Sequence, residues 1–282
     1  MVPRTDLAAE RHFRLKTPPS GIKSNSFQQG PVSVQRLRIE TPEGAAALDK
    51  PMGDYRTLTL PEHWETDPEL LEAVTDAVAK ELSELLPREG PVLVAGLGNR
   101  AVTPDALGPL AADRIAATRH VRQAMPELFS HLRQVSVLSP GVLGTTGIET
   151  AEILESLADR IQPACLLVLD ALCAADSGRL CNTVQLCDTG ITPGEGTGTA
   201  RCRLDREALG IPVIALGIPT VTDVSTLVRE QTGMKAREPG WLVTRSDIDG
   251  LLRHCVNLVS RAVNLALHPG LSAQELALLL ES

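Results

Sequence analysis

The chain has 282 residues, of which 43% are hydrophobic, and this is enough for one large α/β domain or two small ones. A net charge of −8 and the lack of any Lys/Arg cluster in the sequence argue against a nucleic-acid-binding protein, because neutralising phosphates requires a basic patch. Aromatic residues make up only 2%, so the chain has few side chains on which bases or sugars could stack.

The first 50 residues are polar and rich in Arg, Gln, Ser and Pro. We expect them to form a loosely packed arm, in which the alternating segment 32–39 has the pattern of a strand. Apolar residues then recur at helical spacing over residues 70–85, after a possible capping box formed by Thr66 and Glu69. This pattern predicts an amphipathic helix.

From residue 91 onward, segments with the composition of buried strands alternate with helical segments. The expected strands cover residues 91–96, 134–139, 164–171, 182–188 and 212–217, and the expected helices include one that ends near His120 and one near 147–160. The alternation predicts an α/β fold with three αβα layers and a mainly parallel sheet.

Two further segments complete the expected organisation. Gly and Thr are dense over 188–203, which predicts an exposed loop or hairpin that could form one wall of a cleft. Apolar residues recur at helical spacing between Ser246 and His268, with Ser246 as the candidate cap. We expect this last helix to close the domain.

The cysteines and the apolar segments indicate the compartment. None of the six cysteines belongs to a CxxC pair, so we expect reduced structural thiols. The sequence has no apolar amino-terminal segment and no run of about 18 apolar residues. We therefore expect a cytoplasmic protein without a membrane span.

Two of the expected strands lead to an aspartate. The strand over 91–96 runs into a glycine loop that contains Asp105, and the strand over 164–171 contains Asp170 near its end. Because ligands bind at the carboxyl ends of parallel strands, the two carboxylates could converge at one crevice. Two close carboxylates do not both ionise easily, so one keeps its proton as a general acid while the other activates water. Such a pair suits peptide hydrolysis.

Structural roles for both aspartates also fit the spacing. Asp105 could cap a helix that begins near Pro104 or Gly108, and Asp170 could orient a neighbouring loop through backbone hydrogen bonds. The glycines before Asp105 match neither the dinucleotide-binding pattern nor the Walker A pattern, and an aspartate facing a phosphate would repel it.

A second glycine loop covers residues 139–150. Its backbone N–H groups could bind a carbonyl or a developing oxyanion, although an ordinary connection between strand and helix has the same composition. Glu149 could contact a ligand or favour the helix dipole. The sequence contains neither a GxSxG nucleophile elbow nor an HExxH zinc motif.

Several segments together resemble one known family. The segments VAGLGNRAVTPDALGP, SPGVLGTTGIET, VLDALCA, NTVQLCDTGITPG and LGIPVIALGIPTVTD occur in the order and approximate spacing of the germination protease of spore-forming bacteria, also called the spore protease. The segment RTDLAAE near the amino terminus and VTRSDIDGLLRHCVNLVSRAVNLALH near the carboxyl end extend the resemblance over most of the chain. This combination is far more specific than a single glycine loop.

The resemblance implies an endopeptidase that starts the degradation of small acid-soluble spore proteins during germination, in the forespore and spore core. It also implies a homotetramer and a zymogen that trims its own amino terminus. Family substrates are cut after an acidic residue and before an apolar residue followed by Ala. The segment Thr5-Asp6-Leu7-Ala8 has this pattern, so we expect self-cleavage between Asp6 and Leu7.

The resemblance also implies a division of the chain. Residues 1-6 are expected to be a propeptide, and residues 7-282 a single peptidase domain with an amino-terminal arm over 7-60 and an α/β core over 66-282. Residues 1–6 or the adjoining arm could cover the carboxylate crevice.

The family is similar in fold to hydrogenase maturation proteases, and its two suspected catalytic aspartates correspond to Asp105 and Asp170. Weaker candidates for positioning water or substrate are Asn99, Gly144, Glu149 and Asp188. No cofactor and no direct nucleic-acid contact are expected. Two alternatives stay open: a maturation-type peptidase with a metal at the two aspartates, and a non-catalytic binding module on the same fold.

Overall fold

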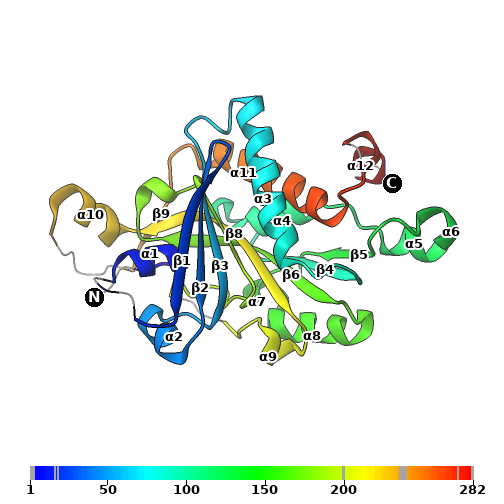
Figure 1. Ribbon diagram of the computed structural model, residues 1–282, viewed down its shortest axis with the longest axis horizontal. Helices are drawn as coiled ribbons and strands as arrows, with labels where there is room; N and C mark the ends of the chain where they lie inside the picture. Colours follow the sequence, from blue (N-terminus) through cyan, green and yellow to red (C-terminus); the bar gives the residue numbers. More distant parts are fainter. Residues whose placement is uncertain are drawn as a thin grey trace.

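The computed structural model describes residues 4–15, 17, 19–198, 201–234, 240–271 and 273–280. Residues 1–3 of the expected propeptide, residues 199–200 of the expected loop and residues 235–239 lie outside the described residues. A nine-stranded sheet forms the centre of the molecule (Figure 1). Its strands are β1 (Ile22–Gln29), β2 (Val32–Ile39), β3 (Gly53–Thr59), β4 (Val92–Gly96), β5 (Val135–Leu138), β6 (Cys165–Ala174), β7 (Thr183–Cys187), β8 (Val213–Asp223) and β9 (Leu242–Val243).

The sheet has a parallel half and an antiparallel half. The strand order is β1-β2-β3-β7-β8-β6-β4-β5, and β9 pairs with β8. Strands β5, β4, β6 and β8 are parallel, and all four coincide with strands expected from the sequence. Strands β7, β3, β2 and β1 extend β8 in alternating directions. The expected α/β fold is confirmed, and its parallel part is the half that contains Asp105 and Asp170.

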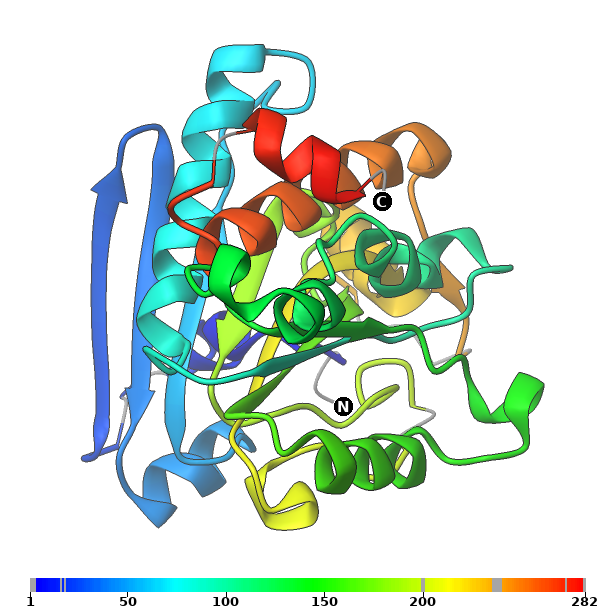
Figure 2. The ribbon, with the colours of Figure 1, turned by 90° about the vertical axis from the view of Figure 1, so that its right-hand side faces the viewer.

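Helices cover both faces of the sheet, which gives the expected three layers (Figures 1 and 2). One face packs against α3 (Pro68–Leu85), α4 (Leu107–Ala112) and α11 (Ile248–Leu267), and the other against α2 (Pro42–Leu48), α8 (Thr150–Ile161) and α9 (Arg206–Leu209). The remaining helices are α1 (Ala8–Phe13), α5 (Arg119–Ala124), α6 (Pro126–Phe129), α7 (Leu143–Thr146), α10 (Val224–Thr232) and α12 (Ala273–Leu280), with short 3-10 turns η1 (Thr103–Asp105) and η2 (Ser177–Arg179). In the part of the chain that the structure describes, none of these helices is long and apolar enough to cross a bilayer.

The central strands are apolar on both faces because helices cover both faces. In β4, Val92 and Val94 belong to the core beneath α3, α4 and α11, whereas Leu93 and Ala95 belong to the core on the opposite side. Successive side chains of a strand point to opposite faces. A strand buried on both faces therefore reads as one continuous apolar run, which is why its position follows from the sequence.

The start of helix α3 differs from the expected capping box. The helix begins at Pro68, and Asp67 is the cap: its carboxylate accepts hydrogen bonds from the N–H groups of Glu69 and Leu70. Thr66 does not cap the helix. Proline suits the first helical position because its fixed φ is helical and its missing N–H is not needed there, so the residue before Pro68 becomes the cap.

Two more helix boundaries differ from expectation. Helix α11 begins at Ile248 without a side-chain cap, so Ser246 does not have the role expected of it. The helix expected to end near His120 is two helices, because α4 ends at Ala112 and α5 begins at Arg119. Asn264 of α11 explains the break: its side chain accepts from the N–H of Ala116 at 2.9 Å and donates to the carbonyl oxygen of Arg114 at 2.8 Å.

The expectation of a loosely packed amino-terminal arm is wrong. Leu7 and Ala8 are 0% exposed, and Val32, Val34 and Leu58 belong to the core. The segment is polar because its strands have one face toward solvent and because some of its buried side chains are charged and paired. Figure 2 shows the β1–β2 hairpin at the edge of the molecule, in continuous register with the rest of the sheet.

Candidate active site

Asp105 and Asp170 line one cavity of about 630 Å³ at the carboxyl ends of β4 and β6. Asn99, Glu149 and Asp6 line the same cavity. The parallel strands β4 and β6 are direct neighbours in the sheet. Their pairing brings together Asp105 and Asp170, which are 65 residues apart in the sequence. The expected convergence of the two carboxylates is confirmed.

The loop after β4 holds the Asp105 carboxylate. Asp105 ends η1, and its Oδ2 accepts the N–H of Asn99 at 2.7 Å. Gly98 has φ +118°, and a Cβ atom there would lie 1.9 Å from the carbonyl oxygen of Asp105, so this close approach requires glycine. Helix α4 has no side-chain cap. The alternative in which Asp105 serves as a helix cap is therefore wrong.

Asp170 lies inside β6, which continues beyond the expected strand end to Ala174. Its register partner in β8 is Gly217. Asp170 is 7% exposed, and its Oδ1 accepts the N–H of the next residue, Ala171, at 2.9 Å. The side chain thus bonds within its own strand, and it does not orient a neighbouring loop as the structural alternative required.

The two aspartates differ in their electrostatic environment. Burial raises the pKa of Asp170 well above its ordinary value of 3.8, and the charges of Asp105 and Asp6 raise it further. Burial also raises the pKa of Asp105, but the hydrogen bond from Asn99 opposes that shift. Asp170 therefore holds its proton to higher pH, whereas Asp105 ionises first. This is the asymmetry that an acid and base pair needs.

The amino-terminal segment runs through the cleft beside these carboxylates. The N–H of Asp6 donates to the carbonyl oxygen of Cys173 in β6 at 2.9 Å, and the N–H of Cys173 donates to Oδ2 of Asp6 at 2.8 Å. Leu7 packs in a small apolar cluster with Leu172, Ala174 and Leu180. The peptide bond between Asp6 and Leu7 is thus held in the cleft by backbone pairing on one side and a buried side chain on the other.

Gln185 of β7 holds both sides of this peptide bond. Its Nε2 donates to the carbonyl oxygen of Asp6 at 3.0 Å, and its Oε1 accepts the N–H of Ala8 at 2.7 Å. Gln185 pairs in register with Gly217, which pairs with Asp170. Gln185 was not predicted from the sequence, although a glutamine within an otherwise buried strand is a signal that could have identified it.

The glycine-rich loop after β7 forms a wall of the cleft, as expected. Nη1 of Arg4 donates to the carbonyl oxygen of Thr197 at 3.2 Å. A Cβ atom on Gly196 would lie 2.2 Å from Oδ2 of Asp6, and one on Gly198 would lie 2.5 Å from Nη1 of Arg4. Both glycines therefore make room for the side chains that precede the Asp6–Leu7 bond.

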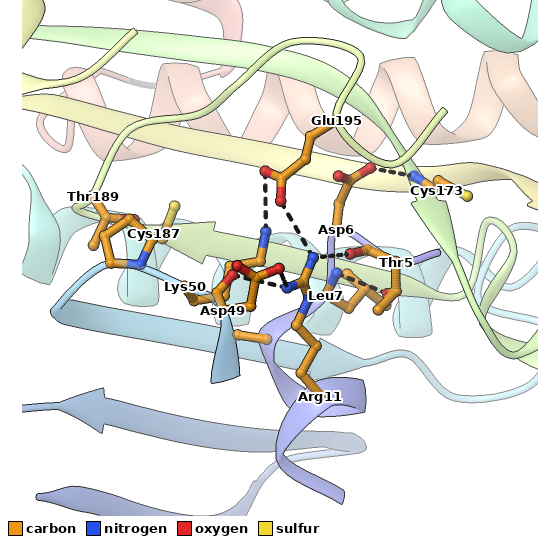
Figure 3. A network of polar contacts seen from close by, with 12 residues as sticks. Thr5, Asp6, Leu7, Arg11, Asp49, Lys50, Cys173, Cys187, Thr189 and Glu195 are labelled. Atoms are coloured by element: carbon orange, nitrogen blue, oxygen red, sulfur yellow. Dashed lines mark hydrogen bonds and ion pairs between the residues drawn. The ribbon is translucent and has the colours of Figure 1, made fainter. Parts of the chain in front are cut away.

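Glu195 of the same loop lies between two cations, as Figure 3 shows. Its carboxylate lies 3.2 Å from Nη2 of Arg11 and 3.5 Å from Nζ of Lys50. Nη2 of Arg11 also donates to the carbonyl oxygen of Thr5 at 3.3 Å. Lys50 and Glu195 were not predicted from the sequence, because no local pattern relates two residues so far apart.

Two of the weaker candidates lie elsewhere. Asp188 follows β7, and because β7 is antiparallel to β8, its end lies at the edge of the sheet opposite to the cavity. There Oδ1 of Asp188 accepts the N–H of Asp54 at 2.8 Å. Gly144 lies in α7 and is not among the cavity-lining residues, although Val142 and Leu143 are. The structure therefore brings Asn99 and Glu149 to the aspartates, but not Asp188 or Gly144.

The donor set does not fit a zinc centre. Among the residues that the structure describes, no three His, Cys, Asp or Glu side chains are grouped so that they could hold one metal ion. Zinc sites take three or more protein ligands. We therefore derive the chemistry of the cavity from its carboxylates, amides and backbone groups.

Comparisons with known proteins agree on one family. The model of the family described as "Germination protease" matches residues 5–234. The germination protease of Caldanaerobacter subterraneus subsp. tengcongensis is 38% identical, over 98% of this chain and 98% of that protein. The germination protease of Clostridium perfringens strain 13 is 33% identical over 97% of each chain, and that of Bacillus licheniformis is 40% identical over 80% of this chain and 62% of the other.

Among solved structures, the [NiFe] hydrogenase maturation protease HycI from Thermococcus kodakarensis is similar with a TM-score of 0.39 and 16% identity. The match covers 66% of this chain and 98% of that chain.

Proposed function

The chain belongs to the germination protease family, and from this membership we propose that it is an endopeptidase made as a zymogen, which cuts its own chain between Asp6 and Leu7. The observation that carries the proposal is the position of that peptide bond. Asp6 lines the same cavity as Asp105 and Asp170, and Gln185 hydrogen-bonds on both sides of the bond. The first substrate of the site is therefore a segment of the chain itself.

The proposed reaction uses the two aspartates in different roles. Asp105, as a carboxylate, takes a proton from a water molecule whose oxygen attacks the carbonyl carbon of Asp6. Negative charge develops on the carbonyl oxygen, to which Nε2 of Gln185 donates. Asp170 gives its proton to the nitrogen of Leu7 as the C–N bond breaks. The products are a peptide that ends in a carboxylate at Asp6 and a chain that begins with an amino group at Leu7.

After this cut, the cleft that residues 4–6 occupied becomes open to other chains. We propose that it then takes small acid-soluble spore proteins, in segments where an acidic residue precedes an apolar residue and Ala. The segment of this chain that fills the cleft has that pattern, and its Leu7 and Ala8 occupy fully buried positions. Buried positions of this size select apolar and small side chains. The division into residues 1–6 and 7–282, the homotetramer and the location in the spore core belong to the same proposal.

The test is intact-mass measurement of the purified chain during incubation. We expect a loss of mass equal to residues 1–6 and no other early product. The processed chain is then added to a purified small acid-soluble protein, and the fragments are mapped by mass. A chain that retains residues 1–6 throughout, or fragments that do not end in an acidic residue, would contradict the proposal.

A further inference from the structure

The carboxylate of Asp6 occupies a pocket of its own beside the scissile bond. Its Oδ2 accepts the N–H of Cys173 at 2.8 Å, and the backbone N–H of Gly196 also donates to the carboxylate. Gly196 lies so close that a Cβ atom there would be 2.2 Å from Oδ2 and 2.7 Å from Oδ1. Two backbone donors and one glycine thus enclose the end of the acidic side chain.

Lys50 is the cation with the largest influence on this carboxylate. The Lys50 side chain is only 9% exposed, and its Nζ lies 3.5 Å from Oε2 of Glu195. Burial raises the pKa of Asp6, the charge of Lys50 is the largest opposing influence, and Glu195 acts in the same direction as burial. Figure 3 shows the amine of Lys50 beneath Glu195 and the carboxylate of Asp6 beside Glu195.

Asp6 and Lys50 both line a second cavity of about 440 Å³. Tyr55, Glu195 and Arg203 line it too, whereas Asp105 and Asp170 do not. The acidic side chain thus lies between two spaces: the cavity of the catalytic aspartates and a cavity that contains the lysine. This second cavity leaves room for a longer acidic side chain than that of aspartate.

We propose that this pocket is the subsite for the acidic side chain that precedes the scissile bond, and that Lys50 is its specificity-determining residue. The assignment rests on the proposed function, because it identifies what the same cleft recognises. In the uncut chain Asp6 fills the subsite, and after processing an aspartate or glutamate of another protein takes its place.

The chemistry of the pocket explains why an acid is selected over its amide. An amide carries no charge for Lys50 to attract. An amide side chain also has an NH2 group, which is a hydrogen-bond donor. If this NH2 group pointed toward the N–H groups of Cys173 and Gly196, donors would face donors. Discrimination comes from leaving charged or polar groups of the pocket without a partner. Lys50 therefore supplies the part of the selectivity that depends on charge, and the backbone donors supply the rest.

A double-mutant cycle on self-cleavage of the full chain tests this assignment. Asp6→Asn, Lys50→Met and the double variant are compared with the unmodified chain by the rate at which residues 1–6 are lost. We expect Asp6→Asn to slow cleavage about 100-fold when Lys50 is present, and about 10-fold or less in the Lys50→Met chain. Asp6→Glu should be cut at a rate within about 3-fold of the unmodified chain.

Lys23→Met is the matched control. Lys23 is 73% exposed on the β1 edge strand, so removing its charge should leave the effect of Asp6→Asn at about 100-fold. If the role of Lys50 were purely structural, Lys50→Met would slow cleavage by the same factor with and without Asp6→Asn, and this result would overturn the assignment. Lys50→Arg keeps the charge and should keep most of the discrimination.

A second measurement does not depend on cleavage. Lys50→Met should lower the melting temperature more in a chain that retains Asp6 than in a chain that carries Asp6→Asn, and Lys50→Gln can replace it if the methionine variant does not fold. The proposal of self-processing and the proposal for Lys50 fail in different ways. If the unmodified chain never loses residues 1–6, self-processing is wrong. If the chain does lose residues 1–6 but Asp6 and Lys50 show no coupling in either measurement, only the role of Lys50 is wrong.

Discussion

Two clusters of carboxylates in this protein have opposite surroundings. In the first, which we call the paired cluster, Glu81 and Glu84 of α3 contact Arg36 of β2 and Arg56 of β3. Glu81 is 0% exposed, and it accepts from Nε and Nη2 of Arg36 at 2.9 and 2.6 Å. In the second, the cleft cluster of Asp6, Asp105 and Asp170, the carboxylates lie near one another.

The pKa shifts of the two clusters differ accordingly. In the paired cluster burial acts against ionisation of Glu84, but the hydrogen bonds and charges of Arg36 and Arg56 outweigh it and lower the pKa of Glu84. In the cleft cluster burial raises the pKa of all three aspartates, and for Asp170 the neighbouring carboxylates raise it further. Carboxylates with cationic partners hold the antiparallel strands to α3, whereas the carboxylates of the cleft cluster have raised pKa values, as is common at functional sites.

The largest expected effect is on catalysis in the cleft cluster. Asp105→Asn and Asp170→Asn should each slow self-cleavage by at least about 1,000-fold, because an amide neither takes up the water proton nor supplies one to Leu7. The measurement is the rate at which residues 1–6 are lost, followed by intact mass.

Asp113→Asn is the control for those two variants. Asp113 pairs with Arg100 on the surface, and its substitution should leave the cleavage rate within about 2-fold. Near-normal cleavage by both cleft variants would refute the roles given to Asp105 and Asp170.

The paired cluster should affect stability and not catalysis. Glu81→Gln leaves two arginines without their buried partner, so we expect the free energy of unfolding to fall by about 3 kcal/mol. Urea unfolding followed by circular dichroism measures this loss. The cleavage rate of the molecules that remain folded should not change. If the rate falls by more than the fraction of unfolded molecules explains, the two clusters are coupled.

Gln185 tests whether the polar groups around the scissile bond act on the reaction. Gln185→Leu removes the donor to the carbonyl oxygen of Asp6, and we expect self-cleavage to slow about 100-fold, as for the loss of one oxyanion donor. Gln185→Glu keeps the acceptor for the N–H of Ala8 but not the donor, so it should be equally slow. If Gln185→Glu instead cleaves normally, the side chain only positions the segment.

The smallest effect concerns stability and pH. Because the folded pKa of Asp170 is raised above 3.8, its carboxyl group is best tolerated at pH below 3.8 and destabilises the fold as pH rises through the folded pKa. Asp170→Asn should therefore raise the free energy of unfolding by about 1 kcal/mol at neutral pH, and the gain should shrink as pH falls and the natural carboxyl group takes up its proton. Unfolding curves at several pH values measure it.

The paired cluster should show the opposite dependence. The pKa of Glu84 is lowered below 4.5, so its contribution to stability is present above pH 4.5 and is lost as pH falls through the folded pKa. Unfolding curves of Glu84→Gln should show a lower free energy of unfolding than those of the unmodified chain at neutral pH, and this difference should disappear in acid. Equal pH dependences for the two clusters would remove the distinction between them.

Much of the parallel half of the fold could be predicted from the sequence. Strands β4, β6 and β8 are buried on both faces and therefore appear as apolar runs, and the apolar period of α3 gives that helix its position. The motifs around Asp105 and Asp170 indicated the family, which the comparisons confirm. Helix starts were less predictable, because Asp67 and Thr66 are both good caps and the choice between them depends on where Pro68 falls.

The antiparallel half could not be predicted in the same way. Arg36, Arg56 and Glu81 make their segments look like polar surface, although Arg56 and Glu81 are buried and both arginines form ion pairs with Glu81. The direction of β7 decided that Gln185 lies at the Asp6–Leu7 bond while Asp188 lies at the opposite edge. Strand direction and ion pairing depend on contacts between distant segments, so no local pattern encodes them.

The sequence by itself determined the α/β class and the family, and it pointed to Asp105 and Asp170 as the proposed catalytic pair, because each depends on a local pattern: apolar runs, glycine loops and short motifs. Only the tertiary structure decided that Asp6 lines one cavity with Asp105 and Asp170, that Gln185 brackets the Asp6–Leu7 bond, and that Lys50 lines a second cavity together with Asp6. These relations join residues from opposite ends of the chain and from both halves of the sheet. They exist only after the strands have paired, because the distances that decide electrostatics and hydrogen bonding are distances in space.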